Sequence, residues 1–333
     1  MLRFVLRRLL WAVPTILIVT FLVYVAIRLG TNPSEAYQRS NPRANEEKIR
    51  QYEEINNLFP GVSGYFKGYW GWLRNFFAGL FNGGESWPRS IKGRREVWPE
   101  MKYAMANSLR LGIAASVLGI FIGVLLGIFA ALRPGSLRDS SVNTGAFVAF
   151  SIPPYVSAVL LQLLFAVMWS RWYGDPLLPT SGVYPPGQQG FDLLLMMKHM
   201  VLPVFVVAIQ IIAVYARYMR ASLLDVLNSD FMRTARSKGI SERRVLVGHA
   251  VRNSLIPLVT IAAIDIGGII GGLIITERVF SYPGMGDFFL TAFDNGDFPQ
   301  LMPFMVIIVL AVVIFNLIAD ISYAWLDPRI RVG

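Results

Sequence analysis

Long apolar stretches alternate with shorter polar stretches along the 333 residues of the chain. Several apolar stretches run for about 20 residues with almost no charge, the length that a helix needs to cross a ~30 Å hydrocarbon layer. A helix in a soluble core is rarely apolar on every face over that length. The pattern therefore predicts an all-α, polytopic membrane protein. We place about six transmembrane helices, at 9–27, 105–132, 142–169, 200–219, 257–276 and 303–323.

The first apolar stretch has some features of a cleavable signal peptide. Arg3, Arg7 and Arg8 precede an apolar run that continues to Ile27. That run is longer than the 7–15 residues of a signal-peptide core, and no pair of small residues at −3 and −1 follows it. We therefore expect it to be retained as a transmembrane helix.

The basic residues predict an orientation in the cytoplasmic membrane. With the N-terminus inside, the inside loops 1–8, 133–141, 217–255 and 323–333 hold 15 Lys and Arg residues, whereas the short outside loops 170–199 and 277–302 hold three. Short cytoplasmic loops collect Lys and Arg, so this orientation is favoured and both termini are expected in the cytoplasm. The same rule accounts for much of the net charge of +10, which gives no reason to expect a nucleic-acid partner; membrane lipid is the expected surrounding.

The segment before the second predicted helix differs from the rest, so we divide the chain into 1–104 and 105–333. Residues 33–57 are polar and predict a small helix with loops, whereas residues 65–81 carry many aromatic side chains. Aromatic side chains with one polar end favour a membrane interface. We expect a short amphipathic helix on the outer face of the membrane, and packing against the neighbouring transmembrane helix is an equally weighted alternative.

Several kinds of chemistry have no support in the sequence. The chain has no cysteine and only two histidines, His199 and His249, which excludes disulfides and thiolate sites and speaks against a histidine metal cage. It contains no Gly-x4-Gly-Lys-Ser/Thr phosphate loop, no Gly-x-Ser-x-Gly and no His-Glu-x-x-His. We therefore expect neither an enzyme nor a bound cofactor, and energy for any transport must come from a partner.

The inside loop 217–255 is longer and more polar than a connector requires. Residues 230–244 predict a helix, a glycine and a second short helix. Gly239 suits the position after a helix end because it adopts the left-handed conformation cheaply. Ser241 can cap the following helix. A rigid helical turn of this kind suits docking into a groove on a soluble partner.

This loop resembles that of the membrane subunits of binding-protein-dependent ABC importers. The family's loop has the form Glu-Ala-Ala-x3-Gly, and Arg233-Thr234-Ala235, three residues and Gly239 are similar to it. The second half departs from the general family pattern. There the chain resembles the oligopeptide, dipeptide and nickel branch, whose version continues His-Ala-x-Arg-Asn and a later proline. The matching residues here are His249, Ala250, Arg252, Asn253 and Pro257.

A second motif of the same branch follows the fifth predicted helix. The chain reads Gly271-Gly272, Thr276-Glu277, Phe280, Tyr282-Pro283-Gly284-Met285-Gly286 and Gly296-Asp297-Phe298-Pro299. The short first helix and the large segment after it resemble the B-type subunit of oligopeptide and dipeptide permeases. The resemblance covers essentially the whole chain and is weakest at 30–100.

The resemblance implies a type I ABC importer transmembrane-domain fold in a permease subunit that translocates peptides by alternating access. It also implies a second homologous permease subunit, two cytoplasmic ATPase subunits that bind the ATP, and an extracytoplasmic peptide-binding protein. The loop that couples to the ATPase would comprise Asp230, Arg233, Thr234, Ala235, Arg236, Lys238, Gly239, Ile240 and Ser241. For any single arginine of this loop, the general bias of cytoplasmic loops towards basic residues is the stronger explanation.

A translocation path is predicted around the fifth helix. Asp265 lies within it, where a carboxylate is costly and normally faces a cavity or a partner. It could attract the ammonium group of a peptide, or equally pair with an arginine of the partner subunit. Gly268 and Gly272 leave room for a pore or allow close helix packing, and Glu277 follows them. Gln162, Gln210 and Asn316 are expected to form hydrogen bonds between helices.

Three other functions remain as alternatives. Within the same family the substrate could be nickel, because the binding protein largely selects it. An ion-driven secondary transporter should show coupling acids and inverted repeats, and only Asp265 supports it. A membrane enzyme would need a catalytic set that the sequence does not show.

Overall fold

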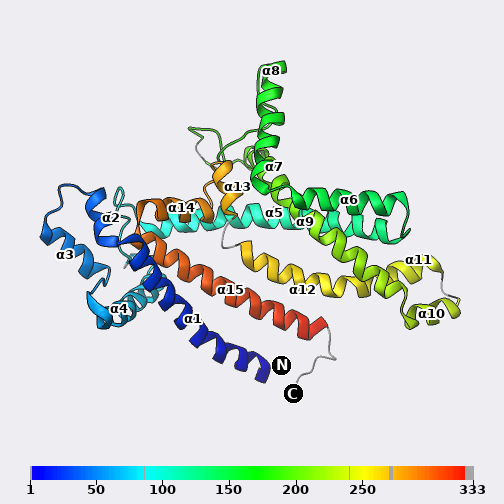
Figure 1. Cartoon of the computed structure of the whole chain (residues 1–333), viewed down its shortest axis with the longest axis horizontal. Helices are drawn as coiled ribbons and strands as arrows, with labels where there is room; N and C mark the ends of the chain where they lie inside the picture. The colour runs from blue at the N-terminus through cyan, green and yellow to red at the C-terminus, as the bar shows by residue number, and fades with distance from the viewer. Residues whose placement is uncertain (1, 86, 189, 240, 270–272, 327–333) are drawn as a thin grey trace. The chain divides into compact units, whose positions relative to one another are not determined.

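The computed structural model describes residues 2–85, 87–188, 190–239, 241–269 and 273–326, and all regular elements within these ranges are helical (Figure 1). This agrees with the predicted all-α class. The elements are α1 (Leu2–Thr31), α2 (Pro33–Ser40), α3 (Glu46–Ile55), α4 (Gly61–Phe81), α5 (Val97–Ala131), α6 (Leu137–Ser151), α7 (Pro154–Gln162), the π-helix η1 (Leu163–Met168), α8 (Trp169–Tyr173), α9 (Leu193–Leu227), α10 (Asp230–Ser237), α11 (Glu242–Arg244), the π-helix η2 (Val245–Val251), α12 (Arg252–Ile269), α13 (Ile274–Val279), α14 (Met285–Asn295) and α15 (Phe298–Leu326).

The helices form two compact units, described here separately. Unit 1 comprises residues 1–108, 270–274 and 283–317, and unit 2 comprises residues 109–269, 275–282 and 318–333. Helices α5, α13 and α15 contribute residues to both units.

Within the described ranges, five helices are long and apolar enough to cross a membrane: Leu10–Thr31, Val97–Ala131, Pro154–Tyr173, Leu193–Leu227 and Phe298–Ile318. They cover the first, second, fourth and sixth predicted transmembrane helices and part of the third. The predicted bundle of about six is thus confirmed in kind.

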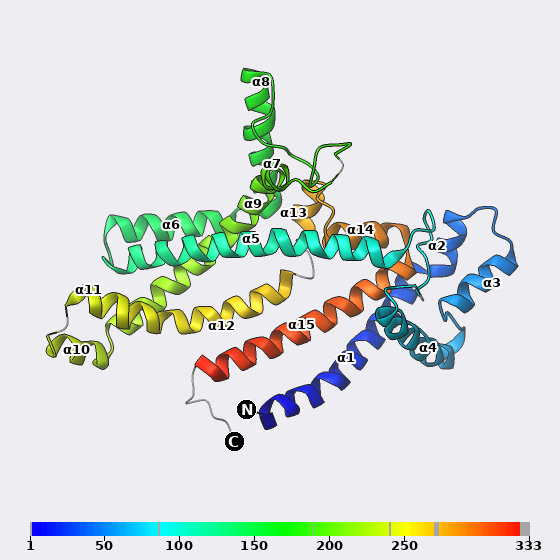
Figure 2. The ribbon, with the colours of Figure 1, turned by 180° about the vertical axis from the view of Figure 1, so that it is seen from behind.

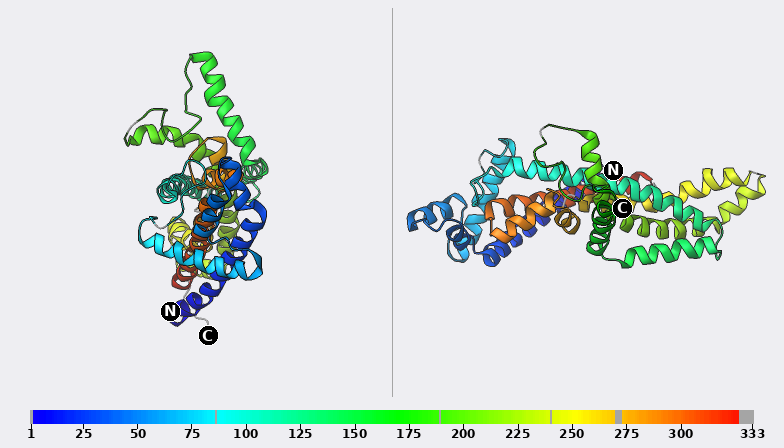
Figure 3. Two further views of the ribbon diagram at one scale, coloured as in Figure 1. Left: turned by 90° about the vertical axis from the view of Figure 1, so that its left-hand side faces the viewer. Right: turned by 90° about the horizontal axis from the view of Figure 1, so that it is seen from above.

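The third predicted helix, 142–169, differs from the structure. Helix α6 ends at Ser151, and a new rod begins at Pro154 and continues through η1 and α8 to Tyr173 (Figure 3). Pro153 and Pro154 explain the break, because a proline has no N–H to donate and the residue before a proline avoids the helical conformation. The candidate transmembrane helix therefore starts later and extends further than predicted.

The fifth predicted helix, 257–276, is also divided. Helix α12 ends at Ile269 and α13 begins at Ile274, while residues 270–272 lie outside the described ranges. Neither helix alone is among the five candidates that satisfy both length and hydropathy.

The core of unit 1 forms where the aromatic helix α4 packs against α1. Tyr69, Trp72 and Phe76 of α4 are buried, and the Tyr69 hydroxyl lies 2.8 Å from the Thr20 hydroxyl of α1. Tyr24 of α1 donates a hydrogen bond to the carbonyl of Asn57. The predicted helix over the aromatic segment is confirmed, and one of its faces is used for packing. The preceding polar segment holds two short helices, α2 and α3, rather than one.

The core of unit 2 depends on close contact between α5 and α9 (Figure 2). Gly119, Gly123 and Gly127 recur every fourth residue along α5 and therefore share one face. A Cβ atom added to Gly123 would lie 2.9 Å from Cβ of Tyr215, and one added to Gly127 would lie 2.6 Å from the carbonyl oxygen of Ala216. The backbones of the two helices therefore meet along this face, as small residues allow in membrane proteins.

Glutamine side chains join helices of unit 2, as predicted for Gln162 and Gln210. Gln210 of α9 donates hydrogen bonds to the carbonyls of Ala149 and Ile152, at the end of α6. Gln162 of α7 donates to Thr180 and Val279. These amides satisfy carbonyls that the breaks in the helices leave free. The prediction for Asn316 stays a prediction.

Gly123→Ala should destabilise the protein by ~1–3 kcal/mol, because the added methyl group overpacks the α5–α9 contact. Gly145→Ala is the matched control, since it removes another glycine inside a helix and nothing lies within 4 Å of its added Cβ. Thermal unfolding of the detergent-solubilised protein is the measurement. Equal melting temperatures for the two variants would contradict the packing described.

Candidate functional site

Residues 230–244 form the helix, turn and helix that the sequence predicts. Helix α10 ends at Ser237, and Gly239 follows with φ +74°, in the left-handed region. Its N–H donates to the carbonyl of Arg236 at 3.0 Å, which satisfies an end carbonyl of the helix. Ser241 stands at the cap position of α11, but its side chain makes no capping hydrogen bond. Ile240 lies outside the described residues.

Buried apolar side chains attach this segment to the rest of unit 2. Met232 of α10 and Val245 and Ala250 of η2 are buried in one cluster with Met219 and Leu223 of α9 and Ala131 of α5. Met232 is fully buried, whereas the neighbouring Phe231 is exposed. The segment is therefore packed against the ends of α5 and α9 and is more than a flexible loop between helices.

The outer surface of the segment is exposed and rich in charge. Arg236 donates to Glu242 at 3.1 Å across the turn, and Arg233 lies 3.7 Å from Asp230. Both pairs are solvent-exposed, so each contributes at most ~1 kcal/mol. The other exposed members of the surface are Phe231, Thr234, Ser237, Lys238, Gly239, Ser241, Arg243 and Arg244, while Ala235 is half-buried. This surface can make charged contacts with a partner.

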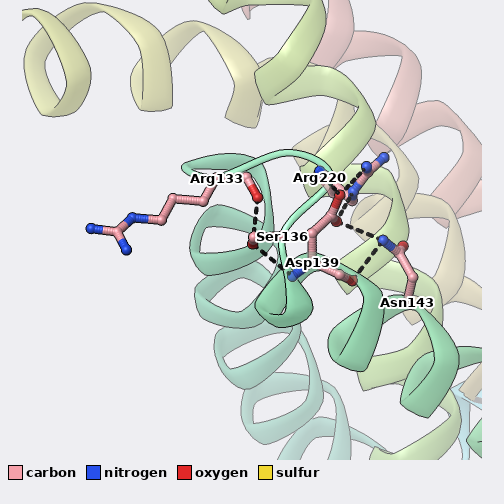
Figure 4. A network of polar contacts seen from close by, with 6 residues as sticks. Arg133, Ser136, Asp139, Asn143 and Arg220 are labelled. Carbon is pink, nitrogen blue, oxygen red and sulfur yellow. Dashed lines mark hydrogen bonds and ion pairs between the residues drawn. The ribbon is translucent and has the colours of Figure 1, made fainter.

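An ion pair with a buried carboxylate joins α9 to the first turn of α6 (Figure 4). The Arg220 guanidinium donates from Nε to Asp139 Oδ1 at 2.5 Å and from Nη2 to Oδ2 at 2.6 Å. The same carboxylate accepts from the Asn143 amide and from the backbone N–H of Gly135. Asp139 is 4% exposed, and removing its charge from water costs free energy. The two-point hydrogen bonding to Arg220 and the extra donors offset that cost.

The arginine also fixes the ionisation of its partner. The hydrogen bond from Arg220 lowers the pKa of Asp139 from 3.8 to about 2, against the opposing effect of burial. Hydrogen bonds from Gly135 and Asn143 act in the same direction as Arg220. The carboxylate therefore remains charged at every physiological pH.

Asp265, predicted for a translocation path, has one oriented oxygen. The hydroxyl of Tyr215, itself buried, donates to Asp265 Oδ2 at 2.8 Å, and the Asp265 residue is exposed in unit 2. Glu277 lies in α13 and is fully buried. Gly268 lies in α12, but its burial is not described. Gly272 lies outside the described residues. Tyr215 is the partner that the structure describes for Asp265.

The second sequence motif has a structural role in unit 1. Asp297, 1% exposed, accepts hydrogen bonds from the Ser90 hydroxyl and the Ile91 N–H. Asn107 donates to the carbonyl of Pro283. Burial raises the pKa of Asp297 to about 6 despite these donors. The motif thus joins the segment before α5 to the start of α15.

Among the described residues, no three His, Asp or Glu side chains lie close enough together to hold a metal ion. His199 is nearly buried, and its Nδ1 lies 2.8 Å from the carbonyl of Ser181.

Sequence reasoning missed the Arg220–Asp139 pair and the anchoring role of Met232. The Ser-x-x-Asp spacing of Ser136 and Asp139 is a sequence signal for a helix start, and Ser136 does cap α6 by accepting from the Asp139 N–H. It does not reveal that Asp139 meets an arginine on another helix. Phe231 and Met232 are adjacent apolar residues of α10, and the sequence does not state that Met232 is the buried one.

Asp139→Asn should lower stability at neutral pH, at the lower end of the ~3–5 kcal/mol expected for a broken buried pair, because Arg220 remains partly exposed. The folded pKa is depressed, so the contribution of Asp139 is present above pH 4 and is lost as pH falls toward 2. Thermal unfolding of the wild type and the variant between pH 7 and pH 3 measures it. Arg133→Gln, which changes an exposed charge in the same turn, is the control. A difference that stays constant down to pH 3 would refute the assignment.

The chain is similar over its whole length to known peptide permeases. It is 34% identical to the oligopeptide transport system permease protein AppB of Bacillus subtilis, over 99% of this chain and 100% of that protein. It is 32% identical to the di/tripeptide transport system permease protein DppB of Pseudomonas aeruginosa, over 99% of each. Among solved structures, the MetNI methionine ABC transporter in an inward-facing conformation matches with TM-score 0.52 and 15% identity, over 68% of this chain and 96% of that one. This match confirms the predicted importer fold.

The family model that matches describes the binding-protein-dependent transport system inner membrane component, and it covers residues 123–332. That range includes the 230–244 segment, the Arg220–Asp139 pair and Asp265. The chain belongs to this family, and is thus a multi-pass inner-membrane permease subunit of a binding-protein-dependent ABC transporter.

Proposed function

We propose that this chain is a permease subunit that translocates oligopeptides or dipeptides into the cell at the expense of ATP hydrolysed by its partners. The observation that carries the proposal is the full-length similarity to permeases named for oligopeptide and di/tripeptide transport. Membership of this family implies that the chain works with a binding protein and an ATPase. The finer composition proposed here is a second homologous permease, two ATPase subunits and an extracytoplasmic peptide-binding protein.

The 230–244 segment, hereafter the coupling segment, is proposed to dock on an ATPase subunit in the cytoplasm. Its exposed outer surface and its buried attachment through Met232 support this role. The distribution of basic residues supports a cytoplasmic location for the segment and for both termini. The five basic residues of the segment suit an acidic rim on the partner.

Transport would follow from alternating access. ATP binding closes the ATPase dimer, the coupling segments of the two permeases follow it, and the helices of the permeases rearrange around the path between them. The energy transmitted is limited by the difference in affinity of the coupling segment for the two ATPase states. A segment packed into unit 2 can pass on that difference, whereas a loosely attached loop would absorb it.

Asp265 is proposed to face the translocation path. Tyr215 fixes one carboxylate oxygen, and the exposure of the residue leaves the other side of the carboxylate accessible in this chain. A carboxylate at this depth suits the ammonium group of a peptide. Pairing with an arginine of the second permease is the competing role.

Gly239→Val should release the ATPase subunits, because a β-branched residue in the left-handed region costs ~1–3 kcal/mol and distorts the turn of the coupling segment. Gly239→Asn is the matched control, since asparagine tolerates this conformation. Affinity purification of the tagged permease in mild detergent, with the co-purifying proteins identified, is the measurement. Nothing lies within 4 Å of an added Cβ, so a change reflects backbone conformation and not a clash.

Two results would contradict the docking proposal. One is a wild type that purifies without any ATPase. The other is a Val variant that retains the ATPases as fully as the wild type and the Asn variant do.

Asp265→Asn should reduce uptake of a dipeptide with a free amino terminus by about tenfold, while uptake of an N-acetylated dipeptide falls less. The measurement is uptake into proteoliposomes that contain the complete transporter and its binding protein. If the second permease is lost on purification of the variant instead, Asp265 pairs with that subunit. Uptake of nickel and not of peptide by the wild type would replace the proposed substrate.

A further inference from the structure

The Arg220–Asp139 pair joins α9, the helix that precedes the coupling segment, to the first turn of α6. Arg220 lies about two turns before α9 ends at Leu227, and α10 begins at Asp230. Asp139 lies in the first turn of α6, directly after the turn that follows α5. The pair therefore connects α9, which leads into the coupling segment, to the hairpin formed by α5 and α6.

Helix α6 is fastened to α9 at both ends by polar contacts. At its start, the Asp139 carboxylate receives two hydrogen bonds from Arg220. At its end, Gln210 donates to the carbonyls of Ala149 and Ile152. These polar contacts at two separate points oppose sliding and rotation of α6 along α9.

Helices α5 and α9 are also in close contact next to Arg220. A Cβ added to Gly127 of α5 would lie 3.0 Å from the backbone nitrogen of Arg220. Ala131, at the end of α5, shares the buried cluster with Met219, Leu223 and Met232. The ends of α5 and α9 and the coupling segment are thus packed together. Helix α6 packs along α9, and the ion pair adds a directional contact at its start.

A buried ion pair is a poor means of adding stability but an effective means of fixing geometry. Replacing such a pair by apolar residues is often neutral for stability, whereas its two-point hydrogen bonding fixes one orientation. The Asp139 carboxylate uses both oxygens on Arg220 and further donors on Asn143 and Gly135, so it has little freedom to adopt another arrangement. Its constant negative charge keeps the pair intact across physiological pH.

We propose that Arg220 and Asp139 are positioning residues that make the α5–α6 hairpin move as one body with the coupling segment. When the ATPase displaces the coupling segment, the pair passes the displacement to α6 in addition to α9. Without it the ATPase would still dock and still move α9, but α6 would lag and less of each ATP cycle would reach the substrate path. The inference rests on the proposed function, since it assumes that the coupling segment contacts an ATPase.

The test compares transport with ATP hydrolysis in the complete transporter, reconstituted in proteoliposomes with its binding protein. The variants are Asp139→Asn and Arg220→Lys, which keeps the charge but loses the planar two-point pair. The control is Arg133→Gln, which removes a charge from the same turn; Figure 4 shows the Arg133 side chain directed away from Asp139.

The proposal predicts that both single variants co-purify with the ATPases as the wild type does. Their peptide uptake per ATP hydrolysed should fall by about 5-fold or more, the lower range of couplings between distant sites. The control should match the wild type. Arg220→Lys keeps the test valid if Asp139→Asn fails to fold.

Two results overturn the proposal: a wild-type ratio of uptake to hydrolysis in well-folded Arg220→Lys, or loss of ATPase co-purification in step with loss of uptake. The second result would assign the pair to docking or folding alone. Failure of the proposed function has a different signature, because wild-type protein would then show no peptide uptake or no bound ATPase at all.

Discussion

Close contact between the backbones of α5 and α9 is the constraint on which unit 2 depends. In a lipid environment, apolar side chains gain little by leaving the solvent, so helices associate through tight packing and hydrogen bonds. Gly119, Gly123 and Gly127 bring α5 against α9 at a distance that no larger residue would permit. The same helix α9 carries Gln210 and Arg220, whose side chains make the polar contacts to α6.

The cost of leaving polar groups without partners explains where the helices break and what lies at each break. The carbonyls freed at Ile152 and Ala149 accept from Gln210, and that of Val279 accepts from Gln162. In unit 1, Asp297 collects donors from Ser90 and Ile91. Each of these breaks is thus closed by a side chain that lies far away in the sequence, which converts a local irregularity into a contact between elements.

Local signals in the sequence predicted the helices and the coupling segment, whereas contacts between distant residues were beyond them. The lengths of the apolar stretches located most transmembrane helices. Gly239 predicted a turn because glycine adopts the left-handed backbone conformation at low cost. The break at Pro153 and Pro154 was available as a local signal but was overridden by the apolar run around it. Arg220 and Asp139 are 81 residues apart, and no local pattern states which arginine meets which carboxylate. For the same reason Asp265 could be singled out as costly, but its partner Tyr215 could not.

The placement of Met232 and Arg220 bears on how a soluble motor can act on membrane helices. A partner that binds the exposed face of α10 can move only what α10 is attached to, and that attachment runs through Met232 into the ends of α5 and α9. Apolar contacts of this kind resist separation but resist sliding poorly, because they are not directional. A two-point ion pair is directional, and Arg220 supplies one between α9 and the first turn of α6. Apolar packing therefore holds α5, α9 and α10 together, whereas the Arg220–Asp139 pair fixes the orientation of α6 relative to α9.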